Sequence, residues 1–171
     1  TYLLYKKGWR GINIDIDKIK LDMFRIKRPR DINIQCAVSN KNGTVTYYKQ
    51  GYFSQVNSLD KSSCSEGCRE ETVECKTLTS IIDSTRYRDK QIDVLSVDAE
   101  GHDLEVIKSL DFSRYEPSVI VVEINDKVFE RIRNSELYRY LEGQNYSLIG
   151  WSGVSLFLAS KTFLAKLDSQ I

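Results

Sequence analysis

Short apolar runs, each followed by polar residues, recur along the chain. Four of them have the length and the β-branched content of buried strands: residues 11–15, 32–39, 92–98 and 117–125. Residues 44–48 alternate in polarity after an Asn-Gly turn, which predicts a hairpin arm. Near the end of the chain, residues 145–151 and 154–160 are joined by Ser152-Gly153 and predict an antiparallel hairpin.

Helical periodicity fills the intervals between these strands. Asp17 is placed to cap a short helix whose apolar residues recur at helical spacing: Ile19, Met23 and Ile26. Residues 127–143 predict a broken helical stretch in which Ser135 caps the second part. Because strands and helices alternate, we expect an α/β fold with a Rossmann-like, doubly wound, mostly parallel sheet that ends in the antiparallel hairpin.

Length and composition limit the classes of protein to consider. The 171 residues are 41% apolar, enough for one domain with a sizeable core, so we expect a single domain over residues 1–171. The net charge of +1 gives no strong attraction to nucleic acid. No run approaches the roughly 18 apolar residues of a membrane span, and the first residues lack a secretion signal. We therefore expect a cytoplasmic protein without a nucleic-acid partner or a membrane span.

Residues 49–71 are polar and have no sustained apolar period, which predicts a long loop or insertion. Three cysteines lie in or just after it: Cys64, Cys68 and Cys75. Closely spaced thiolates can bind zinc or form a disulfide, but zinc sites usually have a second cysteine pair or several histidines, and this chain has one histidine. We expect no metal site and ordinary thiols, and the role of the three cysteines stays open.

Three of the predicted strands end in a carboxylate: Asp15, Asp98 and Glu123. In an open α/β sheet the ligand binds beyond the carboxyl ends of the strands, so we expect these acids to share one rim. An acid at the position of Asp15 can accept hydrogen bonds from the hydroxyls of a ribose. The alternative is a solvated or helix-capping acid.

Several candidate catalytic residues lie close together in a strand-to-helix turn with the sequence SVDAEGHDLEV. Asp98, Glu100, His102 and Asp103 gather there, and Gly101 allows a tight passage of the backbone. Carboxylates beside an imidazole can position a hydroxyl or move a proton, and His102 or Asp98 would serve as the base. Acids in a first helical turn also favour the helix dipole without any catalysis, and that alternative remains open.

The string IDVLSVDAEGHDLEVIKSLDFSRYEPSVIVVEIN resembles the "D-x-E-G-H-E" segment and following strand of the FkbM-type methyltransferases. The resemblance includes KKGWRGINIDID, INIQCAVSNKNGTVTYY and KTLTSIID, and it covers most of the chain. It implies a class I methyltransferase fold that uses S-adenosylmethionine.

By the same resemblance, Asp15 is similar in position to the acid that holds the cofactor ribose. Ala37, Val38 and Ser39 resemble the segment near the adenine. Asp98, Glu100 and Gly101 match the signature turn beside the methyl donor, and His102 matches as well. Asp103 stands where the family more often has glutamate.

Family members place a strand and a glycine-rich turn of the form D-x-G-A-N before the stretch that resembles TYLLYKKGW, and the sequence contains no such element. We therefore expect an N-terminally truncated domain that lacks its first central strand. Unpaired strand edges would favour a homodimer.

The function implied by the resemblance is O-methylation of a sugar or other small metabolite, with a small-molecule or glycan acceptor as the partner. One alternative is a non-catalytic Rossmann-like module for binding or assembly, and another is a metal-binding redox protein.

Overall fold

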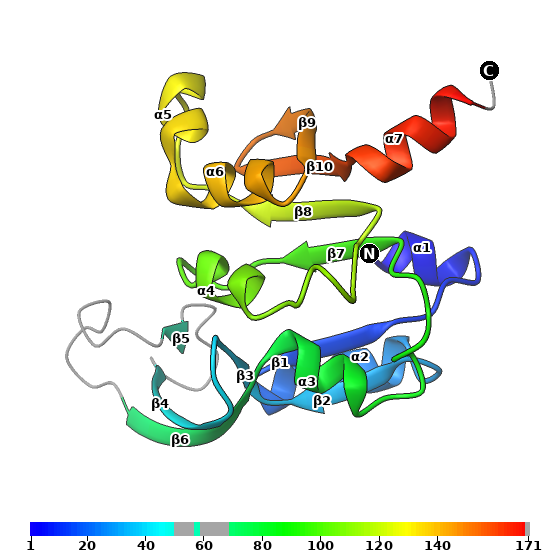
Figure 1. Cartoon of the computed structure of the whole chain (residues 1–171). Coiled ribbons are helices and arrows are strands. Elements are labelled where there is room, and N and C mark those ends of the chain that lie inside the picture. Colours follow the sequence, from blue (N-terminus) through cyan, green and yellow to red (C-terminus); the bar gives the residue numbers. More distant parts are fainter. Residues whose placement is uncertain (50–56, 59–68, 170–171) are drawn as a thin grey trace. The chain divides into compact units, whose positions relative to one another are not determined.

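Figure 1 shows a computed structural model of the chain, which describes residues 1–49, 57–58 and 69–169. Contacts divide the chain into two units, Thr1–Lys76 and Thr77–Ile171. Both units combine helices with parallel and antiparallel strands, so the expected α/β class is confirmed.

The first unit begins with a strand-helix-strand motif. Its elements are α1 (Tyr2–Lys6), β1 (Ile12–Asp15), α2 (Lys18–Lys27) and β2 (Ile32–Gln35). β1 and β2 are parallel and pair from Ile12 with Ile32 to Asp15 with Gln35. Asp17 caps α2 as expected, because its carboxylate accepts a hydrogen bond of 2.8 Å from the amide of Ile19.

The three apolar residues of α2 that the periodicity singled out do not face the core. Leu21 is fully buried, whereas Ile19, Met23 and Ile26 are exposed, Met23 by 61% and Ile26 by 76%. The periodicity therefore identified the helix correctly but not its buried side.

A second sheet of the first unit has the order β3-β6-β4-β5. Its strands are β3 (Ala37–Val38), β4 (Gly43–Lys49), β5 (Asn57–Ser58) and β6 (Arg69–Lys76). The prediction of one strand over residues 32–39 is wrong, because the chain leaves β2 at Cys36 and β3 then pairs with β6. β4 is not a hairpin arm of the preceding strand, since it pairs antiparallel with β6 along its whole length.

The second unit is built on a mixed sheet with the order β7-β8-β10-β9. The strands are β7 (Val94–Val97), β8 (Val119–Glu123), β9 (Tyr146–Ser152) and β10 (Ser155–Ser160). β7 and β8 are parallel, while β10 runs antiparallel to both β8 and β9. The predicted terminal hairpin is confirmed.

The described residues of the second unit also form five helices: α3 (Leu78–Asp83), α4 (Asp103–Lys108), α5 (Phe129–Asn134), α6 (Glu136–Gly143) and α7 (Lys161–Asp168). Ser135 separates α5 from α6 and caps α6, because its hydroxyl accepts a hydrogen bond of 3.2 Å from the amide of Tyr138. The core includes side chains from the strands and the helices: Ile107, Ile120, Val122, Ile132, Leu141, Leu156 and Leu158. Burial of these apolar side chains is the main stabilising term of the unit.

β1 and β7 are edge strands of their sheets. In the part of the chain that the structure describes, each pairs with a single neighbour, β2 and β8 respectively. The doubly wound strand order and the missing central strand therefore stay predictions. Among the described residues, no helix is long and apolar enough to cross a membrane.

Candidate functional site

The acid turn, residues 98–102, connects the carboxyl end of β7 to α4. Its backbone is left-handed at two successive residues, Glu100 with φ +49° and Gly101 with φ +92°. A glycine fits the second position because side chains rarely adopt that conformation. A left-handed glutamate is uncommon, and such positions concentrate at functional sites.

Asp103 holds the acid turn in this conformation. One carboxylate oxygen, Oδ1, accepts a hydrogen bond of 3.0 Å from the amide of Ala99, and Oδ2 accepts one of 3.2 Å from the amide of Gly101. The side chain is buried, with the residue 7% exposed. Asp103 is therefore occupied with shaping the turn.

Asp98 and Glu100 differ from Asp103 in burial and in hydrogen bonding. Both are exposed, and neither side chain makes a hydrogen bond or an ion pair within the described part of the chain. Their carboxylates are thus available to a hydroxyl or a ligand at the end of β7.

His102 lies at the N-cap position of α4 and is half-buried. Its Nδ1 is 3.6 Å from Oε2 of Glu105, a distance that allows an ion pair when the imidazole is protonated. The sequence reasoning missed Glu105, although a histidine and a glutamate three residues apart lie on one side of a helix.

Glu123 ends β8 and lies within electrostatic reach of the acid turn. Burial is the main cause that raises the pKa of its carboxyl, and repulsion from Asp98, Asp103 and Glu100 raises it further. The second unit thus places four carboxylates near one another at the ends of two adjacent parallel strands. Such a group favours a cationic or proton-donating ligand.

Asp15 ends β1 in the first unit. Its Oδ1 accepts a hydrogen bond of 2.8 Å from the amide of Asp17, and burial raises the pKa of the carboxyl. A backbone hydrogen bond from Ile16 also acts on this carboxyl and lowers its pKa, but less than burial raises it. A carboxylate accepts up to about four hydrogen bonds, so Asp15 keeps acceptor capacity for a hydroxyl ligand.

The other predicted cofactor residues also belong to the first unit. Ala37 and Val38 form β3, and the amide of Ser39 donates a hydrogen bond of 3.2 Å to the carbonyl of Lys76. Ala37 and Ser39 are buried. Their shared role with the acid turn in one cofactor site stays a prediction.

The cysteines that the structure describes are not arranged for metal binding. Cys36 and Cys75 are buried free thiols, and burial raises both pKa values, that of Cys36 to about 11. Cys64 and Cys68 lie outside the described residues. Within the described part, no group of three or more His, Cys, Asp or Glu side chains could hold a metal ion.

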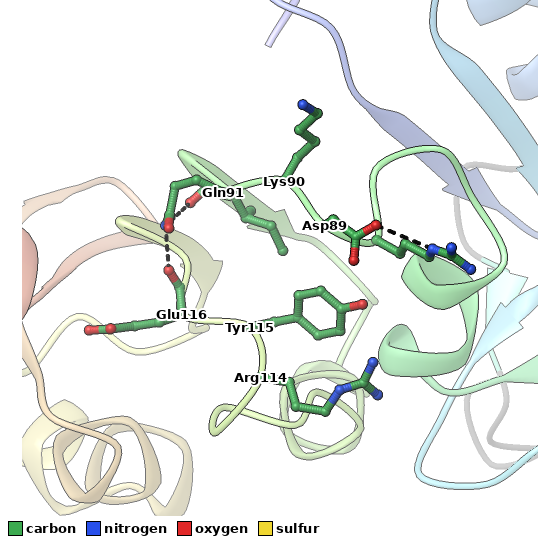
Figure 2. Close-up of a pocket in the computed structure, with 8 residues that line it drawn as sticks. Asp89, Lys90, Gln91, Arg114, Tyr115 and Glu116 are labelled. Atoms are coloured by element: carbon green, nitrogen blue, oxygen red, sulfur yellow. Dashed lines mark hydrogen bonds and ion pairs between the residues drawn. The ribbon is translucent and has the colours of Figure 1, made fainter.

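A polar pocket of about 530 Å³ lies at the end of β7 and β8 that is opposite to the acid turn (Figure 2). It is lined by residues 88–92 and 114–116, which precede β7 and β8 respectively. Gln91 crosses between these segments, since its Nε2 donates a hydrogen bond of 2.7 Å to the carbonyl of Glu116. The pocket is therefore at the amino ends of the strands, away from the acid turn.

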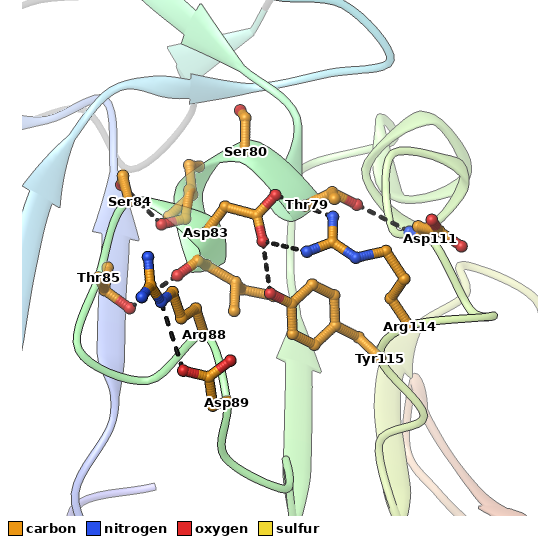
Figure 3. A network of polar contacts seen from close by, with 12 residues as sticks. Thr79, Ser80, Asp83, Ser84, Thr85, Arg88, Asp89, Asp111, Arg114 and Tyr115 are labelled. Atoms are coloured by element: carbon orange, nitrogen blue, oxygen red, sulfur yellow. Dashed lines mark hydrogen bonds and ion pairs between the residues drawn. The ribbon is translucent and has the colours of Figure 1, made fainter.

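A polar network next to this pocket fixes α3 to the segment before β8 (Figure 3). Arg114 binds both carboxylate oxygens of Asp83, at 2.9 and 2.7 Å, and the hydroxyl of Tyr115 donates to the same carboxylate at 2.6 Å. Thr79 accepts a hydrogen bond of 2.8 Å from the amide of Asp111. All these groups satisfy one another, which indicates a structural role.

Comparison with known proteins identifies the family of the chain. The family model described as the methyltransferase FkbM domain matches residues 1–148, which include the acid turn, Asp15 and Glu123. No curated protein and no solved structure matches the chain. Because the family model covers most of the sequence, the chain belongs to the FkbM methyltransferase domain family.

Proposed function

We propose that the protein transfers a methyl group from S-adenosylmethionine to a hydroxyl oxygen of a sugar or another small metabolite. The observation that carries the proposal is the FkbM domain over residues 1–148. In addition, Asp103 holds the acid turn in place, and the side chains of Asp98 and Glu100 make no hydrogen bond or ion pair among the described residues.

The fold we infer for the family domain is a Rossmann-like, doubly wound sheet. β1 and β7 each have one edge without a strand partner in the described part, so a further strand could pair with either. The same edges would also allow pairing between two copies of the chain, and a homodimer remains part of the proposal.

The residues of the first unit fit the ribose end of the cofactor. Asp15 accepts a hydrogen bond from the amide of Asp17, and its carboxylate can accept further hydrogen bonds from a ligand. A half-buried carboxylate gains stability when hydroxyl groups donate to it. Ala37, Val38 and Ser39 would line the adenine, since they follow the neighbouring strand.

When bound, S-adenosylmethionine supplies an electrophilic methyl group on a sulfonium. The protein's part is to hold the acceptor hydroxyl in line with that group and to accept the hydroxyl proton. Asp98 is the candidate base that is exposed and unpaired within the described residues. His102, with Glu105 beside Nδ1, is the second candidate.

Transfer of a labelled methyl group to a panel of methyl glycosides and hydroxy acids tests this function. We expect product from at least one acceptor and a loss of about 100-fold or more in turnover for the variant of the true base, Asp98→Asn or His102→Gln. Glu142→Gln, which changes an exposed glutamate of α6, is the matched control. If both site variants keep full turnover, neither residue is the base.

A further inference from the structure

Helix α2 exposes a stripe of apolar side chains on the surface of the first unit. Ile19, Met23 and Ile26 are 44%, 61% and 76% exposed. Because successive residues of an α-helix are about 100° apart, these three side chains lie within about 60° of one another around the helix axis. Leu21, which is fully buried, lies on the opposite side. Single exposed apolar residues are common, but an aligned stripe of them is typical of a binding surface.

The other side of α2 and both of its ends are fixed to the first unit. The helix packs against β1 and β2 (Figure 1), and the Asp17 carboxylate caps its N-terminus. At its C-terminus the buried Arg28 guanidinium donates hydrogen bonds of 2.9 Å to Oδ1 of Asn13 and 2.6 Å to the hydroxyl of Thr1. The stripe therefore faces outward from a helix whose orientation is set by other residues.

Basic side chains flank the stripe. α2 has one acidic residue, Asp22, and four basic residues: Lys18, Lys20, Arg25 and Lys27. The helical spacing places Lys20 and Lys27 on one flank. Lys18 and Arg25 lie on the other flank, where they pair with Asp22 at 2.7 and 2.5 Å. Each flank therefore has a net positive charge.

Positive charge is concentrated in the part of the sequence that contains α2. Residues 1–31 have nine basic and four acidic side chains, whereas residues 32–171 have 16 basic and 20 acidic ones. The net charge of +1 for the whole chain does not reveal this division. An exposed apolar helix stripe within a basic segment is typical of helices that lie in the plane of an anionic bilayer surface.

A bilayer accounts for both the stripe and the charge, whereas other partners account for one of them. Nucleic acid attracts basic side chains, but contacts with its phosphates do not require an exposed apolar stripe. Protein partners bury apolar side chains, but protein interfaces are depleted in lysine. A second copy of the chain that met α2 by a two-fold contact would place two positively charged helices against each other.

We propose that α2 is a docking surface for an anionic phospholipid bilayer. Ile19, Met23 and Ile26 enter the boundary between headgroups and acyl chains, while the ammonium groups of the flanking lysines stay among the headgroup phosphates. The helix lies on the bilayer and does not span it, in agreement with the absence of a membrane-spanning helix among the described residues. The docking is a property of the first unit and does not depend on methyl transfer.

Co-sedimentation with lipid vesicles tests the docking surface. The probes are vesicles of phosphatidylcholine alone and vesicles of equal parts phosphatidylcholine and phosphatidylglycerol. We expect the chain to sediment with the mixed vesicles and to bind phosphatidylcholine alone about 10-fold or more weakly, because only the mixed surface attracts the lysines. Raising the salt concentration from about 0.1 M to about 1 M should release the protein, since it shortens the Debye length.

Met23→Ser combined with Ile26→Ser removes the most exposed part of the stripe and should weaken binding to the mixed vesicles about 10-fold or more. Circular dichroism checks that the variant folds. Ile149→Ser combined with Leu167→Ser is the matched control, because it changes two exposed apolar residues of the second unit and should bind like the wild type.

Lys18→Gln combined with Lys27→Gln removes one positive charge from each flank and should also weaken binding about 10-fold or more. The matched control is Lys161→Gln combined with Lys166→Gln, which changes two exposed lysines of α7. This pair should leave vesicle binding unchanged.

Three results would overturn the proposal. The first is no sedimentation with the mixed vesicles. The second is binding that Met23→Ser with Ile26→Ser leaves unchanged, because another surface would then hold the vesicle. The third is a dimer that the same variant converts to a monomer, because the stripe would then bind a second copy. The assay contains no S-adenosylmethionine, so none of these results bears on the proposed function.

Discussion

Asp103 shows at the scale of one residue how the candidate site is shaped. Its two oxygens accept hydrogen bonds from the amides of Ala99 and Gly101, so one buried carboxylate sets the path of the acid turn. Hydrogen bonds to a charged group contribute about 1.5–3 kcal/mol each, and two that share one side chain are not additive. The turn thus depends on a residue whose carboxylate is directed at backbone amides.

We expect Asp103→Ala to lower the free energy of unfolding by about 2–4 kcal/mol, and Asp103→Asn to lower it less because the amide oxygen keeps one acceptor. Urea unfolding measures the difference. Asp93→Ala, an exposed aspartate just before β7, is the control and should change little. Equal stability of Asp103→Ala and this control would show that the two hydrogen bonds do not hold the turn.

The sequence identified the chemical groups of the site better than their roles. Asp98 and Glu100 could be predicted as available carboxylates because they follow an apolar strand. The anchoring role of Asp103 could not, because it depends on where the backbone amides of a left-handed turn point.

At the scale of elements, the network around Asp83 connects α3 to the segment before β8. Arg114 is the main cause that lowers the pKa of the Asp83 carboxyl, followed by the hydroxyl of Tyr115. Tyr115 is buried, and the pKa of its phenol is raised, mainly by burial and then by Asp83. An ionised Asp83 therefore stabilises this connection.

The contribution of Asp83 should depend on pH. Because the folded-state pKa is lower than the ordinary value of 3.8, the stabilisation is complete above that value and is lost as the pH falls through the folded pKa. We expect Asp83→Asn to be less stable than the wild type at pH 6, with a difference that shrinks below pH 3.8.

Tyr115→Phe should cost about 0.5–1.5 kcal/mol at neutral pH, since it removes one hydrogen bond. Denaturant unfolding across the pH range provides the measurement for both variants. Asp89→Asn, an exposed aspartate of the neighbouring loop, is the control. A difference between wild type and Asp83→Asn that stays constant with pH would contradict the account.

Helices and strands could be predicted where the local pattern decides them, and pairing could not. Ser135 ends one helix and caps the next because its hydroxyl suits that position, which is a local property. The break at Cys36 is not local, because it arises when Ala37 pairs with Cys75 far along the chain. The exposed side of α2 is likewise decided by what packs against the helix, since Leu21 alone is fully buried there.

At the scale of the whole molecule, the alternation of strands and helices was enough to predict the α/β class. The order of the strands was not, because β7, β8, β9 and β10 form a mixed sheet through contacts between distant segments. The FkbM domain gives the family, and the acids at the ends of β1, β7 and β8 are the groups to which the proposed function assigns the chemistry.

Calorimetric titration of S-adenosylmethionine tests the central claim most directly. It would be carried out on this chain and on the protein with any residues that its gene encodes ahead of Thr1. The account predicts saturable binding of one molecule per chain in at least one form, and about 10-fold or more weaker binding in Asp15→Ala of that form. Asp22→Ala changes a half-buried aspartate of α2 that pairs with Lys18 and Arg25, and this variant should bind like the wild type. Absence of saturable binding in both forms would contradict the account and favour a non-catalytic module.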